Sequence, residues 1–149
     1  MIDGQTGAGT AIVTGGARRI GAELARALAA DGWHLLIHYN RSQREAEALA
    51  AELGNATTVR AELADPDCGD RIMAGLNSLP PPRLLVNNAS IFLNDGAGDF
   101  TIEQWDRHQA VNLRAPALLT QAFAARLAGE SGLVVNLLDA KLAAPNPDF

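Results

Sequence analysis

The stretch TAIVTGGARRIG, residues 10–21, decides the fold that we expect of this chain. The apolar, partly β-branched run at 11–13 predicts a buried strand, and residues 14–16 form a turn signal directly after it. Apolar residues then recur at helical spacing from Ile20 to Leu28. The stretch therefore predicts a strand that passes through a glycine-rich turn into a helix.

The same alternation of strand and helix continues along the chain. Further strands are predicted at residues 33–39, 57–60, 84–86 and 133–138, with helices at 41–54, 67–76 and 101–127 between them. Continuous apolar strands that alternate with helices imply a parallel sheet covered on both faces, and right-handed crossovers make such a sheet doubly wound. We therefore expect an α/β fold, a Rossmann-type doubly wound parallel sheet truncated after its fifth strand. Residues 1–149 would form one domain, with residues 1–9 as a flexible start.

Composition restricts the classes of function. The chain has 149 residues, of which 48% are hydrophobic and 19% charged, a balance typical of one globular domain. A net charge of −5 argues against nucleic-acid binding, which needs a basic face. Cys68 is the only cysteine, no apolar run approaches a membrane span, and the start lacks a signal-peptide pattern. We expect a cytoplasmic protein that has no membrane or nucleic-acid partner.

The glycine-rich turn is a candidate phosphate site. A turn of this kind leaves backbone N–H groups unpaired at the start of a helix, where the helix dipole also favours an anion. Gly15 would permit the tight turn, Gly21 would permit close contact between helix and strand, and Arg18 and Arg19 would add positive charge. An ordinary turn with two solvated arginines is the alternative reading.

The end of the second predicted strand indicates which dinucleotide would bind. An acidic residue there pairs with the ribose 2′-hydroxyl of NAD, whereas an arginine accepts the 2′-phosphate of NADP. This chain has HYNRS at residues 38–42, with no acid and with Arg41 followed by Ser42. A guanidinium can pair with a phosphate through two parallel hydrogen bonds. The pattern favours NADP(H) over NAD(H) and over S-adenosylmethionine, although a solvated loop arginine is the alternative.

Four separated motifs together resemble the short-chain dehydrogenase/reductase family. They are TGGARRIG at residues 14–21, NNAS at 87–90, Asn112 followed by Ala-Pro, and VVNLLD at 134–139. The resemblance covers almost the whole chain from residue 10 onward. Arginine at position 19, where most members have glycine, the HYNRS and NNAS variants and an aspartate in place of the usual catalytic serine are similar to the pteridine reductase and dihydromonapterin reductase branch.

The resemblance implies a set of cofactor contacts. Around the pyrophosphate it places Thr14, Gly15, Ala17, Arg18, Arg19, Ile20 and Gly21. Around the 2′-phosphate it places Tyr39, Asn40, Arg41 and Ser42. Beside the adenine it places Glu62 and Leu63, and along the nicotinamide ribose Asn88, Ala89 and Ser90.

The resemblance also implies roles around the substrate. Asn112 would help to hold a water in a proton relay, and Asp139 would orient the substrate or assist proton transfer. Phe92 would stack on a flat pterin ring, for which aromatic faces are suited. A helix-packing asparagine and a loop phenylalanine that covers the core are the alternatives. The histidines lack metal-ligand spacing, so we expect no metal and interpret them, His38 included, as structural or solvated.

The family's catalytic Tyr-x-x-x-Lys pair has no counterpart here. Tyr39 is the only tyrosine and lies on the wrong strand, while Lys141, the only lysine, has no tyrosine four residues before it. By the resemblance the pair would follow Phe149, so the 149 residues alone would be nearly inactive. The expected whole protein is an NADPH-dependent reductase, a dimer or tetramer, that acts on a C=N or C=O bond of a small molecule such as a pterin or dihydrofolate. A non-catalytic nucleotide-binding module or subunit is the alternative.

Overall fold

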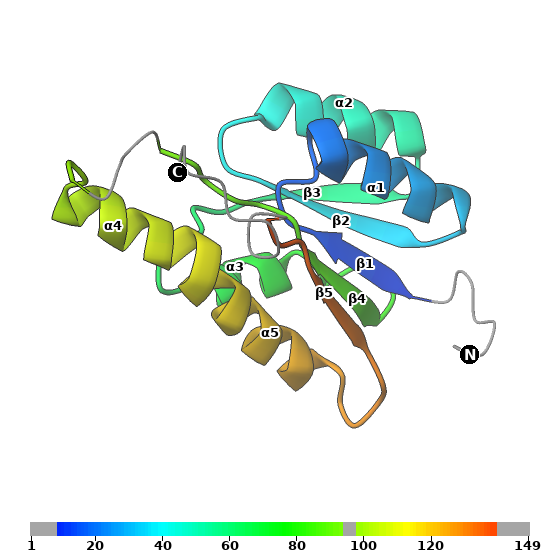
Figure 1. Ribbon diagram of the computed structural model, residues 1–149. Coiled ribbons are helices and arrows are strands. Elements are labelled where there is room, and N and C mark those ends of the chain that lie inside the picture. Colours follow the sequence, from blue (N-terminus) through cyan, green and yellow to red (C-terminus); the bar gives the residue numbers. More distant parts are fainter. Residues whose placement is uncertain (1–8, 94–97, 140–149) are drawn as a thin grey trace.

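The computed structural model describes residues 9–93 and 98–139. Strands and helices alternate through this part of the chain (Figure 1). In chain order they are β1 (Thr10–Val13), α1 (Arg19–Ala30), β2 (His34–Tyr39), α2 (Gln43–Leu53), β3 (Ala56–Arg60), α3 (Cys68–Ala74), β4 (Pro82–Asn87), α4 (Ile102–Gln109), a π-helical turn η1 (Ala110–Arg114), α5 (Ala115–Arg126) and β5 (Leu133–Asn136).

The strands form one parallel sheet in the order β3-β2-β1-β4-β5, which confirms the predicted fold class. In the register of β1, Ile12 lies between Leu36 of β2 and Leu85 of β4. The chain leaves β1 toward β2 on one side, and β4 returns on its other side. Doubly wound sheets bind ligands at this switch point, beyond the carboxyl ends of the strands.

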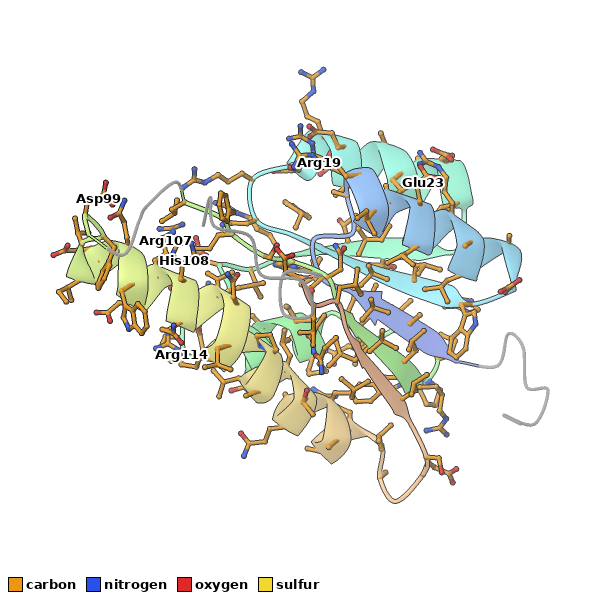
Figure 2. All side chains as sticks on the ribbon, in the orientation of Figure 1. Arg19, Glu23, Asp99, Arg107, His108 and Arg114 are labelled. Carbon is orange, nitrogen blue, oxygen red and sulfur yellow. The ribbon has the colours of Figure 1, made fainter. Side chains whose placement is uncertain are left out.

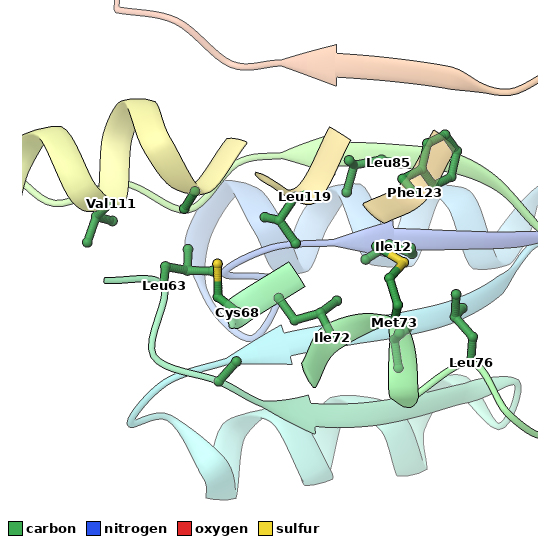
Figure 3. Close-up of a cluster of buried hydrophobic side chains, with 13 residues drawn as sticks. Ile12, Leu63, Cys68, Ile72, Met73, Leu76, Leu85, Val111, Leu119 and Phe123 are labelled. Atoms are coloured by element: carbon green, nitrogen blue, oxygen red, sulfur yellow. The ribbon is translucent and has the colours of Figure 1, made fainter. Parts of the chain in front are cut away.

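Helices cover both faces of the sheet, with α1 and α2 on one face and α3 and α5 on the other (Figure 1). Successive residues of a strand point to opposite faces, so β1 contributes to two separate cores. Ala11 and Val13 pack in the cluster beneath α1 and α2. Ile12 packs with side chains of α3 and α5, including Met73 and Phe123, in the cluster drawn in Figure 3.

The predicted long helix at 101–127 is wrong in one respect, because η1 interrupts it. The helix begins as predicted, since the Thr101 hydroxyl accepts a hydrogen bond from the Gln104 N–H and the Gln104 side chain accepts one from the Thr101 N–H. Within η1 the Ala115 N–H donates to the carbonyl of Ala110, five residues back. Pro116 supplies the physical reason, because it lacks an N–H group and its ring would clash with the carbonyl four residues earlier in a regular α-helix.

Most other boundaries differ from the predictions by one or two residues, and two of these differences have a physical reason in the structure. β5 ends at Asn136 rather than at residue 138, because the ladder with β4 stops at the pair Asn87–Asn136. Gly9, expected in a flexible start, is buried, and its carbonyl accepts a hydrogen bond from the His34 N–H at 3.2 Å. Residues 1–8 lie outside the described part. No helix within residues 9–93 and 98–139 is long and apolar enough to cross a membrane.

Candidate cofactor-binding site

A cleft of about 590 Å³ opens at the carboxyl ends of β1 to β4. It contains every predicted cofactor residue except Thr14. Those that line it are Gly15, Ala17, Arg18, Arg19, Ile20, Gly21, Tyr39, Asn40, Arg41, Ser42, Glu62, Leu63, Asn88, Ala89 and Ser90. The fold therefore brings together segments that lie far apart in the sequence.

The glycine-rich turn packs backbone against backbone. Gly15 has φ of +60°, a left-handed conformation that glycine adopts without steric cost. A Cβ atom added to Gly21 would lie 2.3 Å from the Gly15 carbonyl oxygen and 2.7 Å from Nδ2 of Asn88. The first turn of α1 can approach the turn this closely only because position 21 has no side chain.

Thr14 lies beneath the cleft and connects the glycine-rich turn after β1 with the asparagine-containing loop after β4. Its Oγ1 accepts hydrogen bonds from the N–H groups of Asn88 and Ala89, both at 3.0 Å. The Asn88 amide in turn donates to the carbonyls of Thr14 at 2.8 Å and Gly15 at 3.2 Å. Thr14, predicted as a cofactor contact, is 1% exposed and instead fixes the loop after β4 against the loop after β1.

The cleft is strongly cationic. Arg18, Arg19, Arg41 and Arg107 line it, against a single carboxylate among the described residues, that of Glu62. Arg19 begins α1 and Arg107 belongs to α4 (Figure 2), so positive charge enters the cleft from separate elements. The sequence reasoning missed Arg107, because only the fold brings α4 beside the ends of the strands.

Glu62 is held by several partners at the end of β3. Its carboxylate accepts hydrogen bonds from Nδ2 of Asn40 at 2.8 Å and from the Ala64 N–H at 3.2 Å, and it lies 3.7 Å from the Arg107 guanidinium. Burial alone would raise the pKa of Glu62, but these partners together with Arg41 outweigh it and lower that pKa. The carboxylate is therefore ionised at neutral pH.

His38 also lines the cleft without having been predicted there, as do Ile91 and Val111. It is 2% exposed; its Nδ1 accepts a hydrogen bond from the Gly15 N–H, and its Nε2 lies 3.1 Å from the Ala61 carbonyl oxygen. Burial lowers the pKa of His38, so the ring is neutral at physiological pH. A polar side chain directly after the apolar run at residues 35–37 was the one available signal.

The three residues predicted around the substrate do not line this cleft. Asn112 pairs with the main chain of Ile91: Oδ1 accepts from its N–H and Nδ2 donates to its carbonyl, both at 2.9 Å. Phe92 is 70% exposed and Asp139 is exposed beyond β5. Their proposed roles stay predictions. Among the described residues no group of three histidine, cysteine or acidic side chains could hold a metal ion.

Comparison with known proteins identifies the family. Residues 9–140 match the model of the short chain dehydrogenases. A short-chain dehydrogenase/reductase, FrzI of a Cladobotryum species, is 40% identical over 85% of this chain and 51% of its own length. Pteridine reductase 1 of Leishmania tarentolae is 31% identical over 91% of this chain and 62% of its own length.

Solved structures agree with this. FolM alternative dihydrofolate reductase 1 from Brucella canis, complexed with NADP, superposes with a TM-score of 0.87 at 39% identity, over 93% of this chain and 58% of that one. A blue fluorescent protein from a metagenomic library, in complex with NADPH, gives 0.85 at 33% identity, over 93% and 58%. The chain thus spans about half the length of the curated relatives it matches. By its sequence over residues 9–140 and by its sheet, this chain belongs to the short-chain dehydrogenase family.

Proposed function

We propose that the cleft binds NADP(H) and that the chain is the cofactor-binding part of an NADP(H)-dependent reductase. The observation that carries the proposal is the chemistry at the end of β2. There Asn40, Arg41 and Ser42 line the cleft, where a carboxylate would select NAD. Arg41 and Ser42 supply a cation and a hydroxyl donor for a 2′-phosphate instead.

The shape and charge of the glycine-rich turn fit a pyrophosphate. The positive end of the α1 dipole faces the cleft, and the absence of a side chain at Gly15 leaves main chain at its wall. Arg19 adopts φ of +51°, in the left-handed region where a non-glycine residue costs about 1 kcal/mol. A cation held there despite that cost is consistent with a role toward an anionic ligand.

The remaining lining residues fit the two ends of the dinucleotide. Glu62 and Leu63 would lie beside the adenine, with the ionised Glu62 carboxylate able to accept a hydrogen bond from an amino group. Asn88, Ala89 and Ser90 would lie along the nicotinamide ribose at the other side of the cleft. NADPH would supply the hydride when bound, while this chain binds and orients it.

We infer a small-molecule substrate with a C=N or C=O bond, and a pterin or dihydrofolate as the first candidate. The similarity to a pteridine reductase and to an alternative dihydrofolate reductase supports this choice. Phe92 would then stack on the substrate ring, and Asn112 and Asp139 would serve proton transfer. Exposed apolar side chains on α4 and η1, among them Trp105 and Leu113, support the expected homo-oligomer.

The cofactor assignment is tested by titrating the chain with NADPH and with NADH while nucleotide fluorescence is followed. NADPH is expected to bind more tightly, and Arg41→Ala should weaken NADPH about 10- to 100-fold, the value of a lost charge-assisted contact, with little effect on NADH. Arg44→Ala is the matched control, because Arg44 is exposed on α2 and does not line the cleft. Equal affinity for the two nucleotides, or an equal loss for both in Arg41→Ala, would contradict the proposal.

A further inference from the structure

The side chain of His38 connects three of the segments that line the cleft. It leaves the end of β2, receives the Gly15 N–H of the turn after β1 at 3.1 Å, and reaches the Ala61 carbonyl just after β3 at 3.1 Å. The main chain of His38 adds a further bond, since its carbonyl accepts from the Gly16 N–H at 3.1 Å. One residue thus binds both amides at the entry of the glycine-rich turn.

The two ring contacts fix one tautomer. A main-chain N–H can only donate, so Nδ1 must carry a lone pair toward Gly15, and a carbonyl can only accept, so Nε2 must carry the proton toward Ala61. The ring is 2% exposed, so water cannot readily replace either partner. A lysine, arginine or hydrophobic side chain at position 38 could not make both bonds.

The contacts of His38 determine which part of the glycine-rich turn faces the cleft. Because the Gly15 and Gly16 amides are held inward by His38, the part of the turn that follows, residues 17–21, forms the wall of the cleft. A ligand that binds this wall needs it already in place, since ordering a loop on binding lowers affinity.

We propose that His38 is a positioning residue that orients the glycine-rich turn for the pyrophosphate of a dinucleotide. The proposal rests on the proposed NADP(H) function of the same cleft. It assigns His38 no contact with the 2′-phosphate, so its loss should affect phosphorylated and unphosphorylated dinucleotides alike.

Two substitutions separate the two ring contacts. His38→Asn places an amide oxygen near the position of Nδ1 and can still accept from the Gly15 N–H, whereas His38→Gln places an amide nitrogen near the position of Nε2 and can still donate to the Ala61 carbonyl. Both variants lose one hydrogen bond of the fold, so both should lower the thermal unfolding midpoint by a similar amount. Only His38→Gln releases the glycine-rich turn.

The readout is the dissociation constant for NADPH and for NADH. His38→Gln is expected to weaken both by about tenfold, as for one net hydrogen bond, with the ratio between them unchanged. His38→Asn should stay within about threefold of the unaltered chain. His34→Asn is the matched control, because His34 lies at the opposite end of β2 and does not line the cleft.

Equal losses in His38→Asn and His38→Gln, or none in either, would overturn the inference while leaving NADPH binding by the unaltered chain intact. Failure of the unaltered chain to bind NADPH would overturn the proposed function and this inference with it. If the variants do not fold, nitrogen NMR shifts of the unaltered ring decide: an unprotonated Nδ1 with a protonated Nε2 is expected, and the opposite tautomer or a cation at pH 7 contradicts it.

Discussion

Substitution of Gly21 by alanine tests whether backbone packing at the start of α1 controls the cleft. Two effects oppose each other at this position. Alanine is more favourable than glycine in a helix by about 1 kcal/mol, which would stabilise the chain. Against this, the new methyl group would lie 2.3 Å from the Gly15 carbonyl oxygen and 2.9 Å from Cα of Gly16.

The steric effect should win. The nearest atom belongs to the main chain and cannot rotate away, and the next nearest, Nδ2 of Asn88 at 2.7 Å, is held by its hydrogen bonds to the carbonyls of Thr14 and Gly15. An ordinary contact requires a separation larger by roughly 1 Å, and overpacking of this kind costs about 1–3 kcal/mol. With the helix-propensity gain subtracted, we expect the free energy of unfolding to fall by up to about 2 kcal/mol. The shift of the turn should also weaken NADPH binding at least tenfold.

Denaturant unfolding and NADPH titration of Gly21→Ala measure the two effects. Gly98→Ala is the control, because a Cβ atom there meets nothing within 4 Å, and it should leave both quantities unchanged. If Gly21→Ala is as stable as the unaltered chain, or more stable, and binds NADPH equally well, the close approach of α1 to the glycine-rich turn is not what shapes the site.

Three further predictions concern stability. Burial lowers the pKa of His38, so the unfolded chain takes up a proton at a higher pH than the folded chain. The free energy of unfolding should therefore fall as the pH drops below about 6.5 toward the lowered pKa of the folded state. Unfolding curves between pH 8 and 5 measure this slope, and His38→Asn should flatten it. Thr14→Val should cost about 1–3 kcal/mol in denaturant unfolding, because the Ala89 N–H loses its acceptor while the Asn88 N–H keeps only the Val86 carbonyl, and a restored value is expected for Thr14→Ser. Thr101→Ala should cost about 1 kcal/mol by the same assay through loss of the capping box with Gln104, and Thr101→Ser should not.

The sheet could be predicted because its strands carry local signals. Each is a short apolar run next to a turn or a helix start, and the parallel order follows from the alternation with helices. The glycine-rich turn and the end of β2 could also be located, since both depend on residue types at fixed places in a strand–turn–helix unit. For this reason the cleft contains residues 15, 17–21 and 39–42 as a group.

The rest depends on contacts between segments that are distant in the sequence. Arg107 enters the cleft only because α4 lies beside the loop after β3. The Thr14 side chain does not line the cleft, because its hydroxyl accepts a hydrogen bond from the main chain of the loop after β4. His38 was interpreted as structural or solvated because neither of its partners is visible in the sequence, both being main-chain groups more than twenty positions away. Asn112 could be noticed as a motif, but its pairing with Ile91 could not.

The π-helical turn η1 divides the helical segment from Ile102 to Arg126 into two helices, α4 and α5, that differ in burial. No residue of α4 is buried, whereas α5 buries Ala115, Leu119 and Phe123 against the sheet. An extra residue in a helix rotates all residues beyond it by about 100° around the helix axis. The residue added in η1 therefore changes the direction in which the side chains of α5 point relative to those of α4. A substitution on α4 should therefore change the cleft, through Arg107, while the core beneath α5 stays as it is.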